Sequence, residues 1–399
     1  MKASIKMRSL AVALLAAMAM SVAVQSVSAE SAASKGQSEV KVNKLLKAQK
    51  INGKSVLKSN DSRLPQVVAY FDHEVDMQNL PKEVRSFLSS YDEAVRRIDE
   101  GVSADEVLMM DGTGTNTVVG PVLGDIEFDQ AAPFNNKCPY INNGRALTGC
   151  VATAMSQIMT FYQYPAVGTG TTTYTGSSGE ATYNFADHPF NWSNILHQYK
   201  GVYTNAQGDA VAELMLACGA SVKMNYNTDG SGANSEKVAP ALRDYFGYDP
   251  QIAFAQPDPS QETQYTIWTT RLRREFDANR PVYYSGGTQT DGHAFVIDGY
   301  KEENGVTYFH VNWGWSGAYN GYFLLTGLRP KSTESGYSYR NQCVYNIFPL
   351  GSGIENTKES GTWKVDMDAP VYTVLGTKIP ATNMQRGMIY IQNGRKFVW

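Results

Sequence analysis

Residues 149–165, with the sequence GCVATAMSQIMTFYQYP, contain the pattern that decides the fold of this chain. Apolar side chains recur at steps of three and four residues, which predicts a helix with one apolar face: Val151, Ala154, Met155, Ile158, Met159 and Tyr162. Pro165 ends the pattern, because proline cannot continue a helix. Cys150 therefore stands at the N-terminus of a helix that we predict over residues 150–162.

The position of Cys150 favours a reactive thiol. A cysteine at a helix N-terminus lies near unpaired N–H groups and the positive end of the helix dipole. Both stabilise the thiolate, which is the nucleophilic form of the side chain. From this segment alone, a buried structural cysteine is the commoner alternative.

A histidine that could act with Cys150 occurs far along the chain, in residues 285–299 (SGGTQTDGHAFVIDG). The apolar run after His293 is bounded by glycines and predicts a strand. Residues 308–317 (YFHVNWGWSG) predict the next strand and an aromatic, glycine-rich turn. A cysteine, a distant histidine on a strand and then an Asn/Trp pair follow the order of a papain-like thiol hydrolase. There the nucleophile comes from a helical half and the base from a sheet half.

Composition narrows the class of protein. The chain has 399 residues, a net charge of −3 and only 18% charged residues, with no basic run that would indicate nucleic-acid binding. Its cysteines are Cys138, Cys150, Cys218 and Cys343, and no C-x-x-C pair predicts a zinc site. If Cys150 is catalytic, one disulfide can form among the other three, but the pattern selects no pair. Cys218 lies in an apolar helical stretch and is expected in the core.

The N-terminus has the pattern of a signal peptide. Residues 1–8 are positively charged, residues 9–24 are apolar, and Val27-Ser-Ala29 fits cleavage before Glu30. An N-terminal anchor helix is the alternative. No other run of about 18 apolar residues occurs, so we expect a secreted protein that is not membrane-bound after signal removal.

The remaining chain divides into a leader, a catalytic domain and a tail. In the leader, residues 30–117, the patterns predict a helical patch at 42–57, a strand at 64–70 and an amphipathic helix at 81–98; a glycine-rich linker follows at 111–117. A small stabilising subdomain that stays attached is the alternative to a cleaved leader. In the tail, residues 351–399, we predict two strands. The tail is interpreted as a secretion-sorting segment, with an appended hairpin that only packs on the core as the alternative.

Helix patterns precede strand patterns in the catalytic domain, residues 118–350. Helices are predicted over residues 150–162, 209–217 and 239–245. Strands are predicted over residues 281–284, 294–297, 307–311, 321–325 and 343–348. This order predicts an α+β domain of two lobes, and the cleft between the lobes is where a thiolate and an imidazole can meet.

These motifs together resemble the streptopain family of secreted bacterial cysteine proteases. The resemblance is carried by residues 148–154 (TGCVATA), 292–299 (GHAFVIDG) and 310–315 (HVNWGW), and residues 60–70 resemble the end of the family's propeptide. It implies a papain-like, two-lobed endopeptidase that is made as a zymogen and acts on proteins or peptides. Its own propeptide is the implied inhibitor, and no metal or organic cofactor is implied.

The resemblance also implies catalytic roles. Cys150 is the nucleophile, and His293 is the base and acid that shares its proton. The oxyanion donors are the Cys150 N–H and the side-chain amide of Gln130. Trp313 is expected to pack on or bond near His293, with Asn312 as its competitor for the orienting role.

Substrate binding is expected at the backbone of Gly292 and at a Gly/Ser-rich loop, where Ser231 is the candidate pocket wall. The resemblance further implies a preference for an apolar side chain two residues before the cut.

Three other functions are compatible with parts of the pattern. A cell-wall peptidase or amide transferase would use the same dyad, but the Asn-Trp-Gly-Trp turn and the leader argue against it. A catalytically idle binding module, or an inhibitor or chaperone of the protease, is disfavoured because Cys150 and His293 are both present.

Overall fold

The computed structural model describes residues 39–108, 114, 116–141, 143–177, 179–256, 264–288, 291–325, 339–350, 366–367, 369–373, 378–384, 389–392 and 395–398. The expected signal peptide, most of the linker at 111–117 and the first part of the tail lie outside the described residues.

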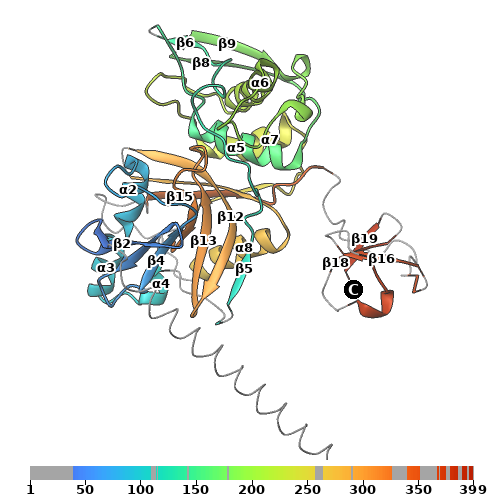
Figure 1. Ribbon diagram of the computed structural model, residues 1–399. Coiled ribbons are helices and arrows are strands. Elements are labelled where there is room, and N and C mark those ends of the chain that lie inside the picture. The colour runs from blue at the N-terminus through green and yellow to red at the C-terminus, as the bar shows by residue number, and fades with distance from the viewer. Residues whose placement is uncertain are drawn as a thin grey trace, which may run out of the picture.

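A helical lobe forms from residues between the leader and the main sheet (Figure 1, green and yellow). Its helices are α5 (Cys150–Tyr162), α6 (Asn205–Ser221) and α7 (Val238–Asp244). Its short hairpins are β6 (Tyr140–Ile141) with β7 (Gly144–Arg145), and β8 (Thr171–Gly176) with β9 (Gly179–Asn184). The predicted helix over residues 150–162 is confirmed. It buries all residues from Val151 to Thr160 rather than one face, because α6 and the main sheet cover it from different sides.

A long antiparallel sheet forms the second lobe. Its catalytic-domain strands are β5 (Thr117–Val119), β10 (Ala253–Ala255), β11 (Val282–Gly287), β12 (Gly292–Glu303), β13 (Val306–Asn312), β14 (Gly321–Phe323) and β15 (Tyr339–Tyr345). Their order is β14-β13-β12-β11-β15-β10, with β5 on β12. Helix α8 (Gln264–Asp277), which the sequence patterns did not predict, contacts β12. The predicted α+β class with two lobes is therefore observed.

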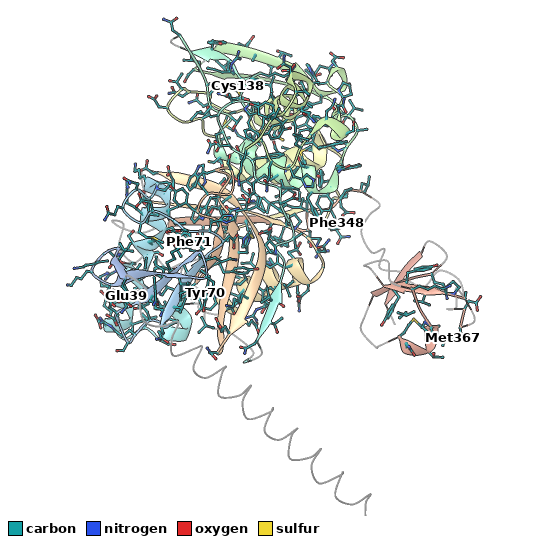
Figure 2. All side chains as sticks on the ribbon, in the orientation of Figure 1. Glu39, Tyr70, Phe71, Cys138, Phe348 and Met367 are labelled. Carbon is teal, nitrogen blue, oxygen red and sulfur yellow. The ribbon has the colours of Figure 1, made fainter. Side chains whose placement is uncertain are left out.

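The leader extends this sheet. Its elements are β1 (Glu39–Lys41), β2 (Leu46–Ile51), β3 (Lys54–Ser59), β4 (Val67–Phe71), α2 (Lys82–Leu88), α3 (Ser90–Asp99) and α4 (Ala104–Leu108). Strand β4 pairs antiparallel with β14, with Tyr70 opposite Tyr322. Figure 2 marks Tyr70 and Phe71 where the leader meets the sheet. Apolar side chains of the leader and the sheet form one shared core, so burial of their common surface holds them together.

Two predictions for the leader are wrong. Residues 42–57 are largely strand, because Asn52 and Gly53 adopt positive φ and turn β2 into β3. The single helix predicted over residues 81–98 is two helices, α2 and α3, on either side of Ser89.

The tail forms a small four-stranded sheet where two strands were predicted. The strands are β16 (Val371–Thr373), β17 (Lys378–Ile379), β18 (Ile389–Gln392) and β19 (Arg395–Val398). A small apolar cluster joins two of its strands to the segment after β17: Val371, Ala381, Met384 and Tyr390. Among the described residues, none of the helices has the length and apolar character needed to cross a bilayer.

Candidate active site

Cys150 is the first residue of α5. It follows Gly149, where any other residue would strain the backbone. Gly149 has φ 84°, and a Cβ there would lie 2.8 Å from Ser231 O and from the Met224 side chain. This close approach sets the direction in which the helix starts. The backbone N–H groups of Val151 and Ala294 donate to the Cys150 sulfur. Burial by itself raises the pKa of the Cys150 thiol, but these donors and the hydrogen bond and charge of His293 bring the pKa below its ordinary value.

His293 enters the site from the second residue of β12. Its Nε2 lies 2.8 Å from the main-chain oxygen of Trp313, and its side chain is hydrogen-bonded to Cys150. Burial by itself lowers the pKa of His293, but the bond and charge of Cys150, the Trp313 carbonyl and the charge of Glu83 raise it above its ordinary value. The two opposite pKa shifts favour a thiolate–imidazolium pair.

Two tryptophans cover the imidazole of His293. The Trp315 ring stacks on it with centroids 4.5 Å apart, and the Trp313 ring lies at 6.1 Å. The two indoles are parallel to within 2°. Trp313 is fully buried, whereas Trp315 is half-buried. Trp313 was expected to pack on or bond near His293, and its main-chain carbonyl makes that bond, whereas the closer ring belongs to Trp315.

Asn312 has other partners. Its Nδ2 donates to Ile126 O at 2.8 Å, and its Oδ1 accepts from the Gly314 N–H at 3.2 Å. The amide therefore ties the tryptophan turn to the segment before α5 and does not bond His293. The role of orienting His293, for which Asn312 was a candidate, belongs to the main-chain carbonyl of Trp313.

The structure places Gln130 beside the segment that leads into α5. The Thr148 N–H donates to Gln130 O at 3.1 Å, and the residue is half-buried. Ser231 is buried, and its Oγ donates to Leu147 O at 2.6 Å and accepts from the Asn227 N–H at 2.9 Å. Its hydroxyl therefore holds its own loop against the entry to α5.

The other cysteines differ from Cys150 in chemistry. All four are free thiols, so none of the disulfides that the sequence left open is formed. Burial raises the pKa of Cys138 and of Cys218 to about 12, and it also raises the pKa of Cys343. Cys218 lies in the core on α6, as predicted. Only the Cys150 pKa is lowered among these thiols, so Cys150 is the one prepared for nucleophilic attack.

Comparisons with known proteins identify the family. The peptidase C10 family model matches residues 128–323. Streptopain from Streptococcus pyogenes is 34% identical over 309 residues, which cover 71% of this chain and 74% of streptopain. The chain belongs to the peptidase C10 family. The thiol protease/hemagglutinin PrtT of Porphyromonas gingivalis is 32% identical over 320 residues, which cover 74% of this chain and 36% of PrtT.

A solved structure extends the comparison to the leader. The prointerpain A fragment of Prevotella intermedia superposes with a TM-score of 0.65 at 26% identity, covering 78% of this chain and 98% of the fragment. This peptidase C10 member is therefore a cysteine-type endopeptidase with a papain-like α+β fold and an N-terminal propeptide. The predicted family, fold class and enzyme class are confirmed.

A cavity of about 580 Å³ opens beside Cys150 and His293 in this peptidase C10 member. Its walls are the loop 231–236 and the strand ends 285–288 and 291–294. Gly292 and Ser231 both line it, but Gln130, Asn312 and Trp313 do not. The β11–β12 register sets Gly286 opposite His293 and Gly287 opposite Gly292, so one rim of the cavity is bare backbone.

Leader helix α2 contacts β11 and meets the tryptophan side of the site through Phe87. The Phe87 ring meets Trp313 edge-on at 5.4 Å. The Lys82 Nζ lies 2.6 Å from the Asp291 carboxylate at the rim of the cavity. The charge of Glu83 acts on His293. The same helix thus contacts the ring cover and the cavity rim.

Proposed function

We propose that this protein is a secreted cysteine endopeptidase, made as a zymogen, that cleaves proteins through a Cys150 thiolate and a His293 imidazolium. The observation that carries the proposal is the hydrogen-bonded pair with opposite pKa shifts at the N-terminus of α5. Family membership supplies the substrate class, because the family is one of peptidases and PrtT is named a thiol protease.

In the acylation step the Cys150 sulfur attacks the peptide carbonyl carbon. The C–N bond breaks, the leaving amine takes a proton from His293, and a thioester remains on the sulfur. In the second step His293 removes a proton from water, the hydroxide attacks the thioester, and the thiolate leaves. The Cys150 N–H and the Gln130 side-chain amide stabilise the oxyanion in both steps.

The imidazole of His293 is oriented by main chain rather than by an Asn side chain. An Nε2–H that donates to the Trp313 carbonyl leaves Nδ1 as the nitrogen that exchanges a proton with Cys150. The Trp315 ring covers the imidazole and excludes water from this bond. Asn312 acts in this proposal by holding the turn, through Ile126 and Gly314.

Substrate binds along the bare backbone rim of the cavity. Gly292 leaves room for an extended peptide to approach. The apolar groups of Val151, Ala233 and Ala294 line the wall that an apolar substrate side chain would contact, and Ser231 holds the loop that carries that wall. No metal or organic cofactor takes part.

The leader acts as the inhibitor until it is cleaved in the linker at residues 111–117. Helix α2 packs beside the dyad through Phe87 and reaches the cavity rim through Lys82, which supports a block on the site. The signal-like residues 1–29 support export, after which processing releases the enzyme outside the cell.

The test compares the full-length chain with two cysteine variants in the presence of a reductant. Cys150→Ala removes the proposed nucleophile. Cys138→Ala is the matched control, since it removes a buried thiol with a raised pKa from the same lobe. We expect wild type and Cys138→Ala to lose the leader's mass and then digest casein, whereas Cys150→Ala does neither.

Two outcomes would contradict the proposal. If wild type takes up a thiol-directed epoxide at Cys150 but neither trims itself nor digests casein, the thiolate is correct and the substrate class is wrong. Peptidoglycan fragments then become the substrate to test. If Cys150 does not react with the epoxide, the dyad mechanism is wrong.

A further inference from the structure

A second histidine is buried at the seam between the leader and the catalytic domain. His310 lies on β13 and is 3% exposed. Its Nδ1 lies 2.5 Å from the carboxylate of Asp298, and its Nε2 lies 2.9 Å from the carboxylate of Asp72. Both ring nitrogens therefore face an anion, one in the catalytic domain and one in the leader.

This arrangement requires His310 to be a cation. Each carboxylate accepts, so both ring nitrogens must donate, and only imidazolium has two N–H groups. Burial by itself lowers the pKa of His310, but the charges and hydrogen bonds of Asp298 and Asp72 raise it to about 10. Burial likewise opposes ionisation of Asp72, yet His310, with weaker help from Lys54 and His73, lowers the Asp72 pKa.

The carboxylates of Asp298 and Asp72 belong to different parts of the chain. The Oδ2 of Asp298 accepts from the Leu123 N–H at 2.9 Å, and its main-chain oxygen accepts from the Val122 N–H at 2.7 Å. Asp298 is therefore anchored inside the catalytic domain and stays with His310 when the leader leaves. Asp72 leaves with the leader, so His310 keeps one partner and loses the other.

Asp72 is placed by the strand that joins the two parts. It directly follows β4, whose end is marked by Tyr70 and Phe71 in Figure 2. Its N–H donates to Asn320 O at 2.9 Å, which extends the pairing of β4 with β14. The Tyr322 ring packs edge-on against His310 at 4.9 Å. Strand pairing thus sets the register that brings this carboxylate to the imidazolium.

Other polar contacts also cross the seam, and among them Tyr70 OH donates to the partly exposed carboxylate of Glu303. Tyr308 OH donates to Val67 O at 3.0 Å, and Tyr91 OH donates to Leu324 O at 2.9 Å. The Lys82–Asp291 ion pair is exposed at both ends, and such pairs contribute little. A largely buried, hydrogen-bonded charge pair that loses one partner is penalised much more.

We propose that His310 is a carboxylate-recognition site of the catalytic domain, and that its ligand is the side chain of Asp72 at the end of a paired β-strand. The site holds the leader in place before processing and rebinds the excised leader afterwards. The inference rests on the zymogen function proposed above and adds to it the residue pair through which the leader is recognised.

The experiment replaces the leader carboxylate alone. Asp72→Asn keeps the shape of the side chain and removes its charge. Glu74→Gln is the matched control, because Glu74 is an exposed acid two residues away whose ion pair with Lys50 lies within the leader. Residue 72 leaves with the leader, so every variant yields the same processed enzyme, and differences in the activation time course arise in the leader.

We expect Asp72→Asn to shorten the lag before casein hydrolysis by about tenfold, because a lost buried charge partner acts mainly on the dissociation rate. Glu74→Gln should keep the wild-type lag. Equal lags for wild type and Asp72→Asn would overturn the proposal.

A second measurement does not depend on protease activity. In full-length Cys150→Ala, amide hydrogen exchange of β4 and β14 should become about tenfold faster with Asp72→Asn and stay unchanged with Glu74→Gln. Unchanged exchange with Asp72→Asn overturns the recognition site whether or not the protein digests casein. If casein is never digested but exchange accelerates, the recognition site stands and the protease-zymogen proposal fails.

Discussion

The Nε2 of His293 lies 2.8 Å from the main-chain oxygen of Trp313, whereas the Asn312 side chain bonds Ile126 and Gly314. The proposed catalytic base is thus oriented by a peptide group that no substitution can delete. Its support comes from residues that hold the turn from 313 to 320. Among them, the Asn320 Oδ1 accepts from the Trp313 N–H at 3.0 Å.

The variant Asn312→Ala tests whether the Asn312 side chain orients His293 or only supports the turn. We expect it to lower the free energy of unfolding by about 1–3 kcal/mol, because two buried backbone groups lose their partner. The pH midpoint of Cys150 alkylation by iodoacetamide should stay near that of wild type. A midpoint that moves as far as it does in His293→Ala would show that the Asn312 side chain itself orients the imidazole.

The pH dependence of Cys150 reactivity follows from the opposite pKa shifts of the dyad. In wild type the lowered pKa of Cys150 means that alkylation and thiolate absorbance should appear below the pH range of an ordinary thiol. In His293→Ala the burial of the sulfur remains and the compensating imidazolium is gone, so the midpoint should rise above that of wild type.

The control for this titration is His197→Ala, which deletes an exposed imidazole paired with Asp125. It should leave the Cys150 midpoint unchanged. An unchanged midpoint in His293→Ala would mean that the thiolate is stabilised by the helix N-terminus and backbone donors alone.

The Trp315 ring should stabilise the charged form of His293. A cation over an aromatic face gains about 0.5–2 kcal/mol, equivalent to at most about 1.5 pH units. We therefore expect Trp315→Leu to move the alkaline limb of the kcat/KM profile to lower pH, whereas Trp315→Phe keeps most of the effect. If both variants keep the wild-type limb, the ring acts only as a cover.

Gly149→Ala should damage the site through the backbone. Its φ of 84° is unfavourable for an L-residue, and the added Cβ would lie 2.8 Å from Ser231 O. We expect a loss of about 1–3 kcal/mol in stability, measured by denaturant unfolding, together with slower Cys150 alkylation. Gly201→Ala, where a Cβ meets nothing within 4 Å, should change neither, and a fully tolerated Gly149→Ala would contradict this role.

Several elements could be predicted because their signals are local. The spacing of apolar residues placed α5, and the glycine-bounded run after His293 placed the start of β12. The hairpin of β2 and β3 had a local signal too, since Asn52-Gly53 is a strong turn pair, but the surrounding Lys-rich pattern was interpreted as helical. Helix α8 also had one: Trp268, Leu272 and Phe276 lie four residues apart and are buried.

Other features had no local signal. The break at Ser89 and the burial of every residue from Val151 to Thr160 depend on what packs around those helices. The pairing of β4 with β14 joins residues about 250 positions apart, and strand sequences do not specify their partners. The contact of Asp72 with His310 depends on that pairing, so the sequence left His310 without a role.

The amino-acid sequence by itself determined the family, through its motifs, and the fold class, through periodicity along the chain, and it named Cys150 and His293 as the candidate reacting side chains. Only the tertiary structure decided that the Trp313 carbonyl rather than Asn312 meets His293, that Trp315 is the closer ring, and that the leader completes the sheet. The physical reason is that a carbonyl is common to every residue, and its direction is set by the fold. A strand likewise presents the same N–H and C=O groups to any neighbour, so its partner is chosen by packing of the whole molecule.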